Sequence, residues 1–309
     1  QDPRARRFEL FSLSHIDGDH IGGGIPLLQQ ARALGLSFGD IWFNGRDHLV
    51  DAAMLSGKDG DDFSTLLRRE KMPWNRWRDG QAIVRPSAPG AAPPQLELAG
   101  GMRLTLLSPV PETLKQLAGT WDADLKAPGT RRVLGARKLE MSEDLDALAA
   151  KPFDPDGSRP NGSSIAVLLE FAGKRALLAA DAYADVLSSA LRGLLPAGQS
   201  RLPLDVFKLS HHGSRGNVND ELLSLVDCGQ YLVSTSGTGF DHPDREALAR
   251  VVRRSARPAT LWFNYPPYAK NLAYHGFWQR PDIQQRWGFQ ARYPAAEAPG
   301  LRFSLFPTT

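Results

Sequence analysis

Four side chains of metal-binding types stand within six positions near the start of the chain: His15, Asp17, Asp19 and His20. They belong to the decapeptide Ser-His-Ile-Asp-Gly-Asp-His-Ile-Gly-Gly, which comes directly after an apolar run at residues 8–13. Imidazole nitrogen and carboxylate oxygen suit divalent ions such as Zn²⁺, Mn²⁺ and Fe²⁺. The glycines permit a tight turn that brings these side chains together at the end of a strand. Taken by itself, the segment can also be an acidic, glycine-rich surface loop.

Three later segments place residues of the same kind after apolar runs. Asp181 follows Ala-Leu-Leu-Ala-Ala, and the pair His211 and His212 follows Phe-Lys-Leu-Ser. His242 lies in the loop after Tyr-Leu-Val-Ser, and five of the seven histidines of the chain fall in the four segments. A lone Asp at a strand end is usually a cap or turn residue, but loops at strand ends also gather active sites. The joint pattern therefore predicts one site built from all four loops.

The elements that must position these loops alternate along the chain. Apolar or alternating runs predict strands at 8–13, 40–44, 82–85, 95–98, 102–107, 164–171, 175–180, 204–209, 230–234, 260–263 and 301–306. Helical spacing predicts helices at 21–34, 62–72, 111–125, 142–150, 184–195, 220–226 and 244–254. This alternation predicts an α/β fold in which helices flank a sheet. We expect a single domain over residues 1–309, with an N-terminal half at 1–150, a Pro- and Gly-rich loop at 151–163 and a C-terminal half at 164–309.

Composition narrows the class of protein. A chain of 309 residues with 42% hydrophobic residues is long enough to bury a large core. The net charge of +3 permits an anionic substrate but is not by itself a nucleic-acid signature. Cys228 is the single cysteine, which excludes an intrachain disulfide and a thiolate zinc cluster. No apolar run approaches the roughly 18 residues of a membrane span, and no signal-peptide core follows the first residues, so we expect a cytoplasmic protein.

Three motifs in this order resemble the metallo-β-lactamase-fold hydrolases. They are the decapeptide at residues 14–23, the segment from Asn-Gly-Ser-Ser to Ala-Ala-Asp at 161–181, and Lys-Leu-Ser-His-His-Gly-Ser at 208–214. The chain is similar to the ComEC-like branch, named for the metallo-hydrolase domain of bacterial DNA-uptake proteins. That branch also has an Asp at the position of Asp17 and a Gly-His-Pro that resembles Asp241-His242-Pro243. The resemblance spans roughly residues 8 to 265 and implies an αββα sandwich with a two-metal site at one edge.

The resemblance also implies ligands and cofactors. Two divalent ions, Zn²⁺ or Mn²⁺, would be bound, the first by His15 and Asp17 and the second by Asp19 and His20. Asp181 would bridge the two ions, and His211, a further metal-site residue, would complete the contacts around them. His212 and His242 are further ligand candidates.

The chain departs from the family pattern in ways that bear on the first ion. Asp17 replaces a more usual His, no histidine lies between His48 and His211, and Ala180 stands where Gly is common. A weak or empty first site follows from these departures. The family also begins with a β-hairpin and a further strand before the ligand turn, whereas one strand precedes it here. We therefore expect a domain lacking its first β-strands, with another segment or a partner supplying them.

The chemistry expected of such a site is hydrolysis. Two ions lower the pKa of a bridging water from about 16 toward 7, giving a hydroxide nucleophile at neutral pH. Asp19 would orient that hydroxide, and His212 or His242 would protonate the leaving group. Ser214 and Arg215 lie beside the ligands in sequence and are candidates to hold a phosphate.

His48 is a further candidate for substrate binding, with a structural role as its alternative interpretation. The leading hypothesis is a metal-dependent phosphodiesterase or nuclease, with DNA or another phosphodiester as substrate. One alternative is a hydrolase of another ester, such as a phosphorylcholine ester or a lactone, because the fold hosts many substrates. Another alternative is a non-catalytic subunit of a larger assembly.

Overall fold

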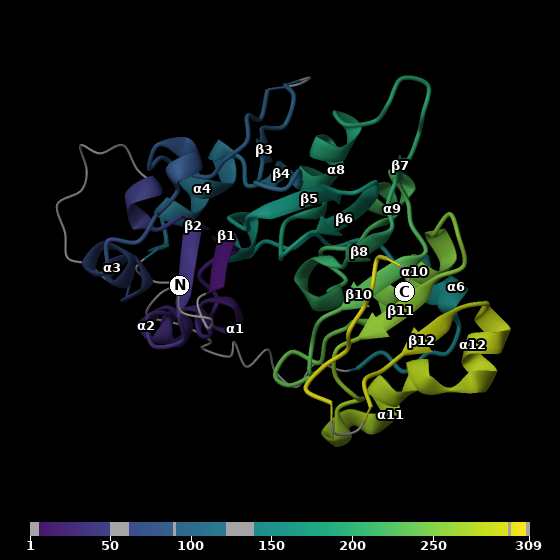
Figure 1. Ribbon diagram of the computed structural model, residues 1–309. Helices are drawn as coiled ribbons and strands as arrows, with labels where there is room; N and C mark the ends of the chain where they lie inside the picture. Colours follow the sequence, from purple (N-terminus) through teal and green to yellow (C-terminus); the bar gives the residue numbers. More distant parts are fainter. Residues whose placement is uncertain (1–5, 50–61, 89–90, 122–138, 296–297, 307–309) are drawn as a thin grey trace.

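The computed structural model describes residues 6–49, 62–88, 91–121, 139–295 and 298–306. They form a mixed α/β fold with a large mixed sheet flanked by helices and, in these ranges, no closed barrel (Figure 1). The predicted α/β class is therefore confirmed. A small parallel sheet contains β1 (Arg6–Ser12) and β2 (Leu36–Trp42). The large sheet has eight strands in the order β12-β11-β10-β8-β6-β5-β4-β3.

One half of the large sheet is antiparallel and the other half is parallel. The antiparallel strands are β3 (Gln95–Glu97), β4 (Arg103–Ser108), β5 (Ala166–Phe171) and β6 (Lys174–Leu178). The parallel strands, which continue from β6, are β8 (Val206–Lys208), β10 (Gln230–Val233), β11 (Thr260–Phe263) and β12 (Gln290–Arg292). A further short pair is formed by β7 (Leu202–Pro203) and β9 (Val226–Asp227). Strands β6, β8 and β10 are parallel neighbours, so the loops after them meet at one edge of the sheet.

Helices cover the two sheets. The N-terminal part has α1 (Gly18–Ile21), α2 (Gly24–Gln30), α3 (Asp62–Arg69) and α4 (Pro111–Ala118). The middle part has α6 (Leu145–Ala149), α7 (Arg159–Gly162), α8 (Ala184–Arg192) and α9 (Asp220–Ser224). The C-terminal part has α10 (Arg245–Arg254), α11 (Leu272–His275) and α12 (Pro281–Trp287). No helix of the described residues is long and apolar enough to cross a membrane.

Strand β5 shows why apolar runs rather than alternating ones mark the central strands. Its residues Ala166 and Leu168 are buried in the main core, whereas Val167 and Leu169 pack into a separate cluster. That second cluster also contains Trp42 of β2, so it lies between the small sheet and the large sheet. A strand that packs on both faces carries apolar residues at successive positions.

Two predicted strands are wrong. Residues 82–85 are extended but belong to no strand, because the side-chain amide of Asn44 takes the place of a neighbouring strand. It donates to the carbonyl of Ile83 and accepts from the amide of Ile83, both at 2.8 Å. Residues 301–306 form no strand either, and the edge of the sheet beside β11 is occupied by β12.

Helix bounds also differ from the prediction. The helix predicted at 21–34 begins earlier, at Gly18, and is divided into α1 and α2, which ends at Gln30. Helix α4 ends at Ala118, and residues 122–125 of the predicted helix lie outside the described ranges. The predicted loop at 151–163 contains the short helix α7. Strands β3 and β4, from the N-terminal half, lie in the same sheet as the strands of the C-terminal half.

Candidate metal centre

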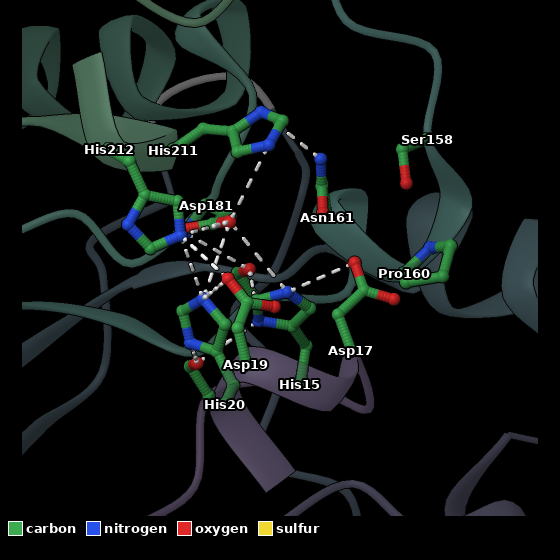
Figure 2. A network of polar contacts seen from close by, with 12 residues as sticks. His15, Asp17, Asp19, His20, Ser158, Pro160, Asn161, Asp181, His211 and His212 are labelled. Atoms are coloured by element: carbon green, nitrogen blue, oxygen red, sulfur yellow. Dashed lines mark hydrogen bonds and ion pairs between the residues drawn. The ribbon is translucent and has the colours of Figure 1, made fainter. Parts of the chain in front are cut away.

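Histidines from two distant segments converge on one carboxylate at the edge of the large sheet. Figure 2 shows their rings around Asp181, which follows β6. The Oδ2 atom of Asp181 lies 3.4 Å from Nε2 of His20, 3.6 Å from that of His212, 3.8 Å from that of His211 and 3.9 Å from that of His15. Two groups among the described residues have ligand atoms close enough to hold a metal ion: His15, His20 and Asp181, and Asp19, His20 and His212.

The first two histidines are oriented by serine hydroxyls. The Oγ atom of Ser14 lies 3.0 Å from Nδ1 of His15 and 2.9 Å from Nδ1 of His20. The hydroxyl of Ser164 is a second partner of His15 Nδ1, at 3.2 Å. Because Nδ1 is engaged in both rings, Nε2 is the nitrogen left to face Asp181. Hydrogen bonds of this kind fix the orientation of histidines that bind metals.

His212 is held in the same manner from another strand. Its Nδ1 donates a hydrogen bond to the backbone carbonyl of Ser234, which follows β10 and can only accept. Its Nε2 atom is the one that faces the cluster, at 3.0 Å from Oδ2 of Asp19 and 3.4 Å from Nε2 of His20. Imidazole nitrogens and carboxylate oxygens that converge in this way are donor atoms suited to a metal cation.

Two buried atoms of the cluster lack a hydrogen-bond partner among the described residues. They are Nε2 of His15 and Oδ1 of Asp181. Burial by itself raises the pKa of Asp181, but the hydrogen bond from His20 and the charges of His15 and His211 hold it well below the usual range. Asp181 is therefore an anion deep in the protein. Because buried polar groups normally find a partner, these two atoms fit the ligands of a bound ion.

His211 is fixed by a polar network behind the cluster. Its Nδ1 lies 2.9 Å from Oδ1 of Asn217, 3.2 Å from Nδ2 of Asn161 and 3.3 Å from Oδ2 of Asp156 (Figure 2 draws Asn161). Burial opposes a charge on this ring, but the hydrogen bond to Asp156 and the charge of Asp181 raise its pKa to about 9. Without a metal ion, His211 is therefore the group that neutralises the buried acid.

The backbone at His211 and His212, and directly before Asp181, is in a left-handed conformation. His211, His212 and Gly213 have φ angles of 45°, 56° and 82°, and Ala180 has a φ of 47° directly before Asp181. Non-glycine residues adopt such angles at a cost of about 1–2 kcal/mol each. Residues held in sparsely populated conformations cluster at functional sites, where the surrounding structure imposes them.

Asp17 and Asp19 occupy the outer side of the cluster. Oδ2 of Asp17 lies 3.4 Å from Nε2 of His15, and its side chain is 40% exposed. The side chain of Asp19 is 61% exposed, and the hydrogen bond from His212 lowers its pKa to about 2. Both carboxylates are therefore reachable by solvent, whereas Asp181 is not.

His242 lies next to the cluster but outside the two groups. Its ring centroid is 5.0 Å from that of His211, and its Nδ1 is 3.6 Å from Oδ1 of Asp244. Burial lowers the pKa of His242, which favours the neutral ring.

Three residues were predicted to bind substrate, and none of them belongs to either of the two possible metal-binding groups among the described residues. His48 accepts a hydrogen bond from the amide of Gly45 and contacts the carbonyl of Gly80, both at 3.1 Å. The Oγ of Ser214 accepts from the amide of Gly216. The guanidinium of Arg215 lies 3.7 Å from the carboxylate of Glu246.

The residues whose hydrogen bonds orient the candidate ligands were not predicted from the sequence. They are Ser14, Asp156, Asn161, Ser164, Asn217 and Ser234. A signal existed for some of them, because Ser14 adjoins the first ligand and the Asn-Gly-Ser-Ser motif at 161–164 is part of the family resemblance.

Comparison with family models and with curated proteins identifies no relative of this chain. A scan against protein-family models finds no match to this chain. A search of the curated proteins finds no match either.

Proposed function

We propose that this chain is a metal-dependent hydrolase of phosphodiesters, with the αββα sandwich and the ComEC-like site of the metallo-β-lactamase fold. The observation that carries the proposal is the convergence of four Nε2 atoms on Asp181 Oδ2, each on a histidine whose Nδ1 is engaged elsewhere. The cluster between the two sheets, with helices outside them, supports the sandwich.

The residues that would hold the metal ions form two sets, one rich in oxygen donors and one rich in nitrogen donors. His15, Asp17 and Asp181 would hold one ion, a set with two carboxylates that suits Mn²⁺. Asp19, His20 and His212, with Asp181 as a bridge, would hold the other, a set that suits Zn²⁺. His20 has its Nδ1 bonded to Ser14, so it offers a single nitrogen and can serve one ion only. The first site has fewer nitrogen donors and is the weaker of the two in this proposal.

The residues of the chain have distinct tasks in hydrolysis. Bound divalent ions would lower the pKa of a water and stabilise charge on a phosphoryl oxygen. Asp19 is exposed and, with a pKa of about 2, is ionised at neutral pH, so it can orient that water as a hydrogen-bond acceptor. His212 would be occupied as a ligand through Nε2, so His242, whose ring centroid lies 5.0 Å from that of His211, is the candidate acid that remains.

We further propose that another strand pairs with β1, supplied by another segment or by a partner. Among the described strands β1 has one neighbour, β2, so its other edge has no strand beside it. Phe8 of β1 is 47% exposed on that small sheet. An unpaired edge next to exposed apolar side chains is a site where strands are added.

Metal analysis and hydrolysis of bis-p-nitrophenyl phosphate test the enzyme together with its site. The wild type should contain a divalent metal and hydrolyse the ester, whereas Asp181→Asn should lose metal and at least about 100-fold in rate. Asp205→Asn is the matched control, because Asp205 pairs with Lys174 outside the cluster. A folded wild type that retains no metal would exclude the enzyme, and equal rates for Asp181→Asn and wild type would exclude the site. Single- and double-stranded DNA as further substrates separate a nuclease from another esterase.

A further inference from the structure

A cleft of about 520 Å³ opens beside the metal cluster, and its lining includes a lysine that the proposed reaction does not use. Asp19, His20 and His212 form one side of this cleft, and Lys208 of β8 lies in the same lining. Other parts of the wall are apolar and come from Phe11, Leu13, Leu27, Ile165, Val167 and Leu178. The cleft is thus lined by candidate ligands, by one lysine side chain and by a largely apolar surface.

The strand register explains why Lys208 faces this cleft. Successive side chains of a strand point to opposite faces, and Phe207 is fully buried in the main core. Lys208 is therefore on the other face, where its cross-strand partner on β6 is Leu178. Leu178 lines the same cleft, which places both side chains on one surface.

Lys208 has no counter-ion in the part of the chain that the structure describes. The charges of Asp181 and Asp19 act on it, but no carboxylate of the described residues forms an ion pair with it. Burial lowers its pKa, which reflects the cost of an ammonium group beside apolar walls. A cation in such a place is normally paired, and apolar surroundings strengthen its attraction to an anion.

We propose that Lys208 is a substrate-binding residue that pairs with a phosphate group of the substrate in this cleft, next to the metal ions. The inference rests on the proposed function and deepens it, since it assigns the anionic part of the substrate to a named side chain. It places the phosphate contact on β8, three positions before His211, rather than at Ser214 or Arg215.

Binding of inorganic phosphate to the metal-loaded protein, measured by calorimetry, tests this assignment. Lys208→Met should weaken phosphate binding about tenfold or more, as expected for loss of a hydrogen bond to a charged group. Lys208→Arg should retain most of the affinity. Lys174→Met is the matched control, because it removes the same charge from β6 at a residue paired with Asp205, and it should bind phosphate like the wild type.

Steady-state kinetics with bis-p-nitrophenyl phosphate give a second readout. Lys208→Met should raise KM about tenfold and change kcat less than twofold, because the ligands of the ions are unchanged. The variant should melt at or above the temperature of the wild type, because a cation without a counter-ion is removed. If it does not fold, Lys208→Gln, which keeps polarity without charge, replaces it in both measurements.

The outcomes separate this inference from the proposed function. Hydrolysis by the wild type together with equal phosphate affinity in Lys208→Met would overturn the role of Lys208 and leave the enzyme intact. Loss of phosphate binding in Lys208→Met, without hydrolysis by the wild type, would support the anion site and count against the enzyme. Equal loss in Lys174→Met and Lys208→Met would show a general charge effect and overturn the inference.

Discussion

The Nε2 atoms of His20 and His212 lie 3.4 Å apart, although 192 positions separate the two residues in the chain. His20 comes from α1, which follows β1 of the small sheet, and His212 from the turn after β8 of the large sheet. The cluster therefore joins the two sheets, and its geometry depends on both being in place.

Removal of the Ser14 hydroxyl should weaken metal binding without removing a ligand. Ser14 Oγ contacts Nδ1 of both His15 and His20, so Ser14→Ala frees the ring of His20 and leaves that of His15 held by Ser164 alone. Loss of such a supporting contact typically lowers metal affinity about 10- to 100-fold. Competition with a chromophoric chelator measures the affinity for Zn²⁺. Ser87→Ala, which removes an exposed hydroxyl bonded to Glu112, should bind the metal like the wild type.

The stability of the metal-free protein should fall as the pH rises through about 9. The pKa of His211 is raised in the folded state to about 9 from an ordinary 6.5, so the protonated ring stabilises the fold fully below about pH 6.5. That contribution is lost as the ring loses its proton. Urea unfolding in the presence of a chelator, between pH 6 and 10, should show the decline. Asp156→Asn, which removes the hydrogen bond that raises this pKa, should shift the decline to lower pH; an unchanged profile in Asp156→Asn would contradict the explanation.

Gly213→Ala should destabilise the turn that carries His211 and His212. Gly213 has a φ of +82°, and a Cβ placed there would lie 2.9 Å from Cβ of Pro243. Strain from the left-handed angle and from this contact should together cost about 2–4 kcal/mol of unfolding free energy and reduce metal content. The measurement is urea unfolding with metal analysis of the folded variant.

Gly173→Ala separates the two causes of strain. Gly173 has a φ of +77° in the turn between β5 and β6, but nothing lies within 4 Å of the added Cβ. It should cost about 1–2 kcal/mol, the penalty of the angle alone, and leave metal content unchanged. A loss in Gly173→Ala as large as that in Gly213→Ala would remove the steric part of the argument.

Asn44→Ala should destabilise the fold strongly and leave the metal site working. The variant leaves both the amide and the carbonyl of Ile83 without their partner, and Ile83 is fully buried. Each unsatisfied buried group costs about 1–3 kcal/mol, so a loss of about 2–5 kcal/mol is expected in urea unfolding. Asn44→Asp can still accept from the amide of Ile83 but cannot donate to its carbonyl. At low pH the protonated carboxyl loses its charge and regains a donor, so the stability of Asn44→Asp relative to the wild type should rise as the pH falls.

The turns that bring the candidate ligands together could be predicted because their signals are local. An apolar run followed by glycines and metal-binding residues marks both the end of a strand and a set of ligands, as at His15 and His20. The groups that orient the ligands could not be predicted in the same way. Ser164 bonds to His15 from 149 positions away, and such a contact depends on the packing of the two sheets rather than on any local pattern.

The fold errors have similar causes. Residues 82–85 read as a strand because Ile83 is apolar and extended, but a side-chain amide satisfies its backbone instead of a ladder. His48, for which the sequence leaves open a substrate contact or a structural role, contacts Gly45 and Gly80 through its nitrogens. In the first case the partner is a side chain distant in sequence, and in the second the partners are backbone groups. The residue types of the segment do not reveal such contacts.

The single free nitrogen of His20 couples the two groups of ligands thermodynamically. An ion held by Asp19, His20 and His212 would take this imidazole from the group that contains His15 and Asp181, so a second ion would be left with His15, Asp17 and Asp181, a set with fewer nitrogen donors. Occupancy should therefore be negatively cooperative. A titration with Zn²⁺ would show a tight step followed by a weaker one, and the concentration of free metal would decide how many ions the protein holds.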